Sequence, residues 1–242
     1  MMKSSDRIIT WRYSTMYSLL DARQQWTLAA GAILLEANAL EFATGYDIER
    51  LDGKREGIIE MFGRAWSIRD EQSFHQQMES FREGSGHHDK FDQRRALLSV
   101  MTHQEQENYI LGLEDETIRT QLKAIQLYDS RLNAASISAW DWGRAISITR
   151  MAMQVGYVDE KTAWTFMYEM AQRIQKAYSS WTEFGLAYLI GRQYGYEELE
   201  TESALEHFSL VEHLFERADS PWNVLPWEEA TVGLPVEPER EG

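Results

Sequence analysis

The chain has 242 residues, no cysteine and a formal net charge of −15. Without cysteine there can be no disulfide, no thiolate metal site and no cysteine nucleophile. The excess of acid repels phosphate backbones, so we expect no nucleic-acid partner, and the length suits one large domain or two small ones.

The placement of proline predicts a helical chain. All four prolines lie at or after Pro221, and proline inside a helix removes a backbone donor and clashes with the preceding turn. The rest of the chain shows helical spacing, with no internal repeat and no strong strand pattern. We therefore predict an all-α protein. One globular domain of about eight to ten helices covers residues 1–218, and an irregular acidic tail covers 219–242.

The first predicted helix, Tyr17–Phe42, has helical spacing and few breakers, and Gly45 beyond it suits a C-terminal cap. A short apolar group follows at Met61–Trp66. The next helix carries an apolar stripe at i, i+4 and i+7. This stripe consists of Phe74, Met78 and Phe81. The glycines after it end the helix, and Glu83–Phe91, which contains two adjacent histidines, is predicted to be a loop.

Capping signals mark the starts of the later helices. Thr102–Glu105 has the S/T-x-x-E form of a capping box, which predicts a helix from about His103. Helical spacing continues after it through the apolar residues Ile118, Leu122 and Ile125.

Three further helices carry the most distinctive part of the sequence. The first spans about Ser136–Val155 and ends at Gly156. Asp159 is a good N-cap for the second, and the box Ser180–Glu183 opens the third. A last amphipathic helix covers about Leu199–Arg217.

The last fifth of the chain holds most of the negative charge. Residues 197–242 contain thirteen acidic side chains against two arginines. This stretch is either a solvated helix face with a frayed tail or a surface that binds a basic protein. The candidates for binding such a partner are Glu197, Glu198, Glu200, Glu202, Glu206 and Glu212. The residues that can pack the tail against the body are Trp222, Leu225 and Trp227.

Several elements occur in a fixed order between Ala139 and Arg192. They are AWDWGR at 139–144, GY at 156–157, AW at 163–164, YSSWTEF at 178–184 and GR at 191–192. This order resembles a bacterial family of small cytoplasmic proteins, domain-of-unknown-function family 1266, with weaker support back to Trp66. The family-like core would cover about 66–195. The resemblance implies a helical fold and supplies almost no chemistry. Many members have a tryptophan shortly after the last element, where this chain has Tyr194 and Tyr196.

Polar residues inside this apolar segment are the candidates for a ligand site. Asp141 and Arg144 are three apart on a predicted helix, so they share a face, and Arg192 could bring a second cation to Asp141. As a site, these residues would line a pocket together with Tyr188 and His87. If their role is structural instead, they form a buried ion pair that fixes the arrangement of the crossing helices.

No motif assigns a reaction. H-E-x-x-H, Glu-x-x-His, phosphate-binding glycine loops and G-x-S-x-G are all absent from the sequence. Glu183 occupies the third helical position of a capping box, and this structural role accounts for a glutamate at that position without any catalytic function. We therefore predict no catalytic residue, no metal ligands and no cofactor; the alternative is a loop histidine that acts as a general acid or base.

Two functions of different class follow. The first is a non-catalytic protein-binding module of the bacterial cytoplasm, such as an immunity or adaptor protein for a basic toxin. The second is an enzyme or small-ligand binder with an Asp/Arg/Tyr-lined pocket. We expect no membrane partner, because no apolar stretch approaches the roughly 20 residues of a membrane span. The sequence leaves the oligomeric state open.

Overall fold

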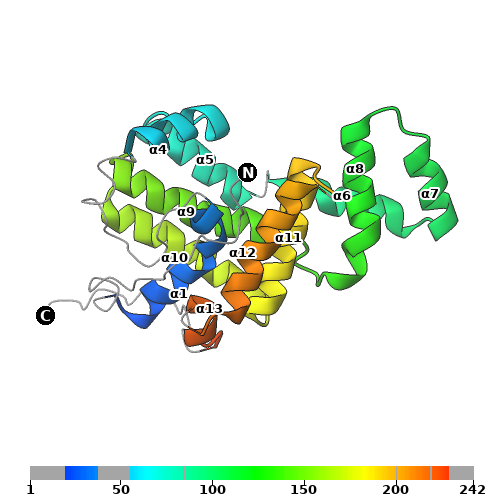
Figure 1. Ribbon diagram of the computed structural model, residues 1–242. Coiled ribbons are helices and arrows are strands. Elements are labelled where there is room, and N and C mark those ends of the chain that lie inside the picture. The colour runs from blue at the N-terminus through cyan, green and yellow to red at the C-terminus, as the bar shows by residue number, and fades with distance from the viewer. Residues whose placement is uncertain (1–19, 38–54, 84–85, 200, 219, 229–242) are drawn as a thin grey trace, which may run out of the picture.

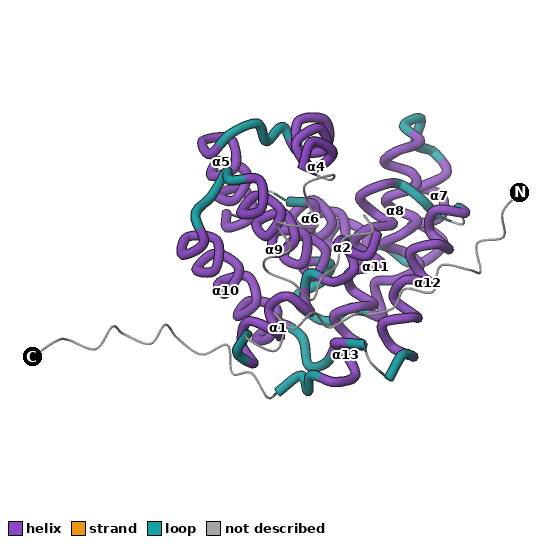
Figure 2. Tube along the Cα trace, turned by 60° about the vertical axis from the view of Figure 1, so that its left-hand side comes forward, coloured by secondary structure: helices purple, strands orange, loops and turns teal. Residues whose placement is uncertain are grey.

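The computed structural model describes residues 20–37, 55–83, 86–199, 201–218 and 220–228. Over these ranges every regular element is a helix and no strand occurs, so the prediction of a single all-α domain is confirmed (Figure 2). Within the same ranges, no helix has both the length and the apolar character needed to cross a bilayer.

Helix α9 (Ser138–Val155) lies at the centre of the fold, and most of its residues are buried on every side. It packs against α10 (Glu160–Ala177) and α11 (Trp181–Tyr196), which surround it with the N-terminal helices (Figure 1). The predicted starts of these three helices and the predicted end of α9 are confirmed to within two residues. Gly156 ends α9 with a φ of 80°, a conformation that favours glycine.

The N-terminal helix differs from its prediction. The described residues show α1 (Ala22–Ala30) and α2 (Ala32–Ala37), separated at Gly31, in place of one continuous helix. The start is later than Tyr17 because the Asp21 side chain accepts a hydrogen bond from the Gln24 amide at 2.7 Å, and Gln24 returns the bond to Asp21. The predicted end at Phe42 and the cap at Gly45 lie outside the described residues.

Three elements follow on one side of α9. They are α4 (Arg55–Met61), the π-helix η3 (Phe62–Trp66) and α5 (Glu71–Glu83). The predicted stripe of α5 is confirmed, since Phe74, Met78 and Phe81 are all buried. The predicted loop Glu83–Phe91 is wrong, because α6 (His87–Ser99) begins at its first histidine.

Helices α6, α7 (His103–Leu111) and α8 (Glu116–Tyr128), with the short 3-10 helix η4 (Asp129–Arg131), form a lobe beside α11 (Figure 1). The lobe has a small core of its own, which also includes Tyr194 from α11. The capping box at Thr102 is confirmed, with both of its reciprocal hydrogen bonds present.

The last helices pack against α11 and the N-terminal helices. Helix α12 (Glu202–Glu216) covers α11, and the tail then turns back through the short helix α13 (Pro221–Val224). The start of the tail is thus more regular than predicted, because Ser220 caps α13 and Pro221 fits its first turn. The Trp222 indole donates to the Ala29 carbonyl at 3.0 Å and stacks on Trp181, with ring centroids 5.5 Å apart.

Candidate functional site

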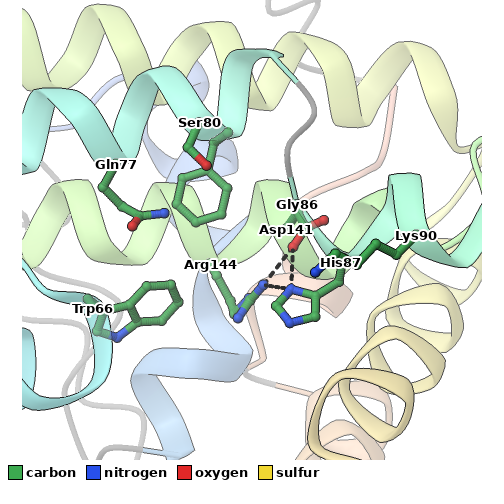
Figure 3. A pocket seen from close by; sticks show the side chains of 9 residues that line it. Trp66, Gln77, Ser80, Gly86, His87, Lys90, Asp141 and Arg144 are labelled. Carbon is green, nitrogen blue, oxygen red and sulfur yellow. Dashed lines mark hydrogen bonds and ion pairs between the residues drawn. The ribbon is translucent and has the colours of Figure 1, made fainter. Parts of the chain in front are cut away.

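The polar centre of the protein is Asp141, in the first turn of α9. Its side chain is 1% exposed and has partners from two helices. Arg144 Nη2 donates to Oδ1 at 2.6 Å. The His88 backbone N–H donates to Oδ2 at 3.1 Å, and His88 Nδ1 lies 2.8 Å from the same oxygen. His87 Nδ1 lies 3.6 Å from Oδ1 (Figure 3). Both histidines of α6 therefore face this carboxylate.

Asp141 caps a helix that is remote in sequence. The residue before α6 is Gly86, which has no side chain to satisfy the first amides, and the Asp141 carboxylate takes that role from α9. A Cβ on Gly86 would lie 2.4 Å from Asp141 Oδ2. Glycine is therefore required here for the close approach of the two helices.

Arg144 is buried but keeps free donors. Its Nε donates to the Trp140 carbonyl at 3.1 Å, and its guanidinium carbon lies 3.4 Å from the Trp140 ring centroid and 5.1 Å from that of Trp66. These rings hold the guanidinium plane in place. Among the described residues no acceptor bonds its Nη1, although the residue is only 6% exposed.

The cluster shifts the protonation of its members. Burial favours the neutral form of Asp141, but the hydrogen bonds from His87 and His88 and the charge of Arg144 hold its pKa well below the ordinary 3.8. Burial also opposes the charge on His88, but the hydrogen bond and charge of Asp141 raise the pKa of His88 above 6.5. Asp141 is therefore ionised, and His88 holds its proton to higher pH than a free histidine.

We expect the stability contributed by His88 to fall as the pH rises. Because its pKa is raised in the folded state, this contribution is complete below the unfolded pKa of about 6.5 and is lost as pH rises through the folded pKa. Urea unfolding should show a larger advantage of the wild type over His88→Asn at about pH 5.5 than at about pH 9. His75→Asn, on the exposed face of α5, is the matched control. An equal advantage at both pH values would contradict the assignment.

A cavity of about 130 Å³ opens next to this cluster. Helices α5, α6 and α9 and the π-helix η3 surround it (Figure 3). Its lining consists of Trp66, Gln77, Ser80, Phe81, Gly86, His87, Lys90, Asp141 and Arg144. The His87 side chain is 40% exposed and Lys90 is exposed, so the cavity communicates with solvent on that side.

Two of the predicted site residues lie elsewhere. Arg192 does not reach Asp141, because its guanidinium donates to Glu198 at 2.8 Å and to Ser203 at 2.9 Å. Tyr188 is buried against Gly143 and is not part of the cavity lining, and burial raises the pKa of its phenol. Asp141, Arg144 and His87 are the predicted residues that the fold brings together.

The acidic candidates divide into two groups. Glu197 accepts a hydrogen bond from Gln121 at 3.1 Å, and Glu198 pairs with Arg192, so both serve contacts within the domain. Glu200 lies outside the described residues. The remaining candidates are exposed on α12: Glu202, Glu206 and Glu212. Two large apolar side chains on the same helix are exposed beside them, Leu205 by 65% and Phe208 by 41%.

Glu183 acts structurally, but not as predicted. Its backbone N–H donates to the Ser180 hydroxyl at 3.1 Å, as the capping box requires. Its carboxylate, however, accepts from the Ser179 amide at 2.6 Å and from Asn133 at 2.7 Å, and not from the amide of the N-cap. The carboxylate therefore joins α11 to the segment before α9.

Sequence reasoning did not assign His88, which lies 2.8 Å from Asp141, to the cluster. It also missed the cavity residues on other elements, Trp66, Gln77 and Lys90. The two adjacent histidines indicated a possible site. Because they were predicted to lie in a loop, the sequence did not indicate that both face α9. In the described part of the chain, no set of three or more histidine and acidic side chains is arranged to hold a metal ion.

The fold and the site define an all-α protein with a buried Asp–Arg–His cluster beside a small cavity. Residues 61–227 match a family model described as "Protein of unknown function (DUF1266)", and the chain belongs to that family. The match extends the resemblance beyond residues 66–195 and takes in the α13 region. No curated protein and no solved structure matches the chain.

Proposed function

We propose that the protein binds a small anionic ligand in the cavity beside Arg144. The observation that carries this proposal is the Nη1 group of Arg144, on a side chain that is more than nine-tenths buried and lines the cavity. Among the described residues no acceptor bonds this donor, so it is available to an acceptor that enters the cavity. A carboxylate or phosphate oxygen of a ligand fills that role well.

The charges around the cavity support an anion. Asp141 and Arg144 neutralise each other at 2.6 Å, so the pair leaves no net charge. Lys90 then adds a positive charge to the lining. A ligand with one negative charge balances this excess.

Lys90→Glu should weaken binding of acetate and inorganic phosphate by about tenfold, equivalent to about 1.4 kcal/mol, because it reverses a charge at the cavity. The affinity is measured from shifts of the Trp66 indole signal in heteronuclear NMR spectra. Lys123→Glu, at an exposed position on α8 outside the cavity lining, gives the same change in net charge as a control. Equal affinities in both variants, or no binding of either anion by the wild type, would overturn the proposal.

The second candidate function is binding of a basic protein by the exposed face of α12. The observation that favours it is the combination of three exposed carboxylates, at Glu202, Glu206 and Glu212, with exposed Leu205 and Phe208. Carboxylates attract a basic partner and speed its approach, and the apolar side chains give contact area. A toxin neutralised by an immunity protein in the bacterial cytoplasm is a partner of this kind.

A charge-reversed variant tests this second candidate. The triple variant Glu202→Lys, Glu206→Lys, Glu212→Lys should lose a basic protein that the wild type retains from host lysate and releases at moderate salt. Glu56, Glu60 and Glu71, exposed on α4 and α5, provide a control triple variant of equal charge change. Retention of the same protein by both variants would remove α12 as the binding surface.

A further inference from the structure

We infer that the ligand of this cavity is a flat aromatic carboxylate of about the size of benzoate. The inference rests on the proposed anion site and narrows its ligand to one chemical class. It is carried by the size of the cavity, its two aromatic walls and the donors that remain free at its polar end.

The size of the cavity suits one aromatic ring. Its volume is about 130 Å³, slightly below the about 150 Å³ of an apolar protein cavity that holds benzene, so one ring fills it and the carboxylate lies toward its open side. The carboxylate of the ligand reaches the polar end of the cavity, where Arg144 and His87 lie (Figure 3). A nucleotide or a sugar phosphate exceeds this space.

The apolar walls are aromatic. Trp66 from η3 and Phe81 from α5 both line the cavity, with ring centroids 6.3 Å apart and planes inclined by 49°. Rings arranged in this way accept a further ring in an offset or edge-to-face geometry. An aliphatic acid packs less well against these two rings, because it has neither the flat shape nor the polarised edge of an aromatic ring.

The polar end suits a carboxylate better than a phosphate. The Arg144 guanidinium is fixed against Trp140, and its free Nη1 presents donors in one plane, which matches a planar carboxylate. A helix N-terminus is the usual phosphate site, but the His88 amide at the start of α6 already donates to Asp141. The N-terminus of α6 is therefore already occupied by the Asp141 carboxylate, which disfavours a doubly charged phosphate there.

The decisive experiment compares four compounds on the full chain by calorimetry and by the Trp66 indole shift. Benzoate should bind about tenfold more tightly than acetate and cyclohexanecarboxylate, and benzamide should not bind, because it lacks the charge. Trp66→Leu removes the indole signal and is therefore measured by calorimetry alone. It should lower the benzoate affinity by about tenfold and leave the acetate affinity unchanged. Trp227→Leu, a half-buried tryptophan in the cluster around Trp26 and Trp181, is the control.

The outcomes separate this inference from the proposed function. If acetate, cyclohexanecarboxylate and benzoate bind equally, the proposal of an anion site is retained and the proposal of an aromatic ligand is overturned. If benzamide binds as well as benzoate, the cavity takes aromatic rings without regard to charge, and both proposals fall. If the wild type binds none of the compounds, both fall together.

Discussion

Asp141→Ala should lower the free energy of unfolding by about 3–5 kcal/mol. The substitution leaves the Arg144 guanidinium buried and without its 2.6 Å ion-pair partner, which is the costly half of a broken buried pair. It also removes the carboxylate that accepts from the His88 amide in the first turn of α6. Urea titration followed by circular dichroism measures the change.

Two further variants show which loss matters. Asp141→Asn keeps an oxygen that can accept from the His88 amide but removes the charge facing Arg144, so it separates the cap from the ion pair. Glu116→Ala breaks an ion pair with Arg119 on α8 whose carboxylate is 70% exposed, and should cost less than about 1 kcal/mol. A loss for Asp141→Ala as small as that of Glu116→Ala would show that the cluster does not stabilise the fold.

Trp222→Ala should destabilise the protein by a similar amount, about 3–5 kcal/mol. This side chain is 5% exposed, stacks parallel to Trp181 and donates to the Ala29 carbonyl. Its removal leaves a large cavity between α1, α11 and α13, and it leaves the carbonyl without its donor. The midpoint and slope of urea unfolding report both the loss and any change in compactness.

Val224→Ala gives the matched control, because Val224 belongs to the same short helix and is 45% exposed. We expect its free energy of unfolding to lie within about 0.5 kcal/mol of the wild type. If Trp222→Ala also remained within this range, the start of the C-terminal tail would be dispensable for the fold, contrary to its packing.

Helices with local start and stop signals were the predictable part of the fold. The caps at Thr102, Asp159 and Ser180 and the glycine at Gly156 lie within a few residues of the helix ends they mark. Their hydrogen bonds span three or four residues, so a single sequence contains all the information they need. The ion pair of Asp141 with Arg144 was predictable for the same reason, since one helical turn joins its partners.

Features that depend on distant contacts were not predictable in this way. The start of α6 lacked a local cap, because its capping carboxylate lies 53 positions away at Asp141. The glycine-rich stretch before it therefore appeared to be a loop, and His88 was missed. Arg192 was assigned to Asp141 from the charges alone, but its partner is Glu198, six residues away, after α11 has ended.

The cap that α9 provides for α6 has a consequence for the order of folding. A contact between residues so far apart in sequence requires a long loop to close before it can form. The first turn of α6 is therefore expected to be ordered only after α9 is in place, which makes docking of the α6–α8 lobe a late event. We expect the His88 amide proton to exchange with solvent through the same local opening of the structure that breaks the Asp141–Arg144 ion pair. Native-state hydrogen exchange measures this. The cavity therefore lies beside the contact between α6 and α9, which we expect to form late in folding.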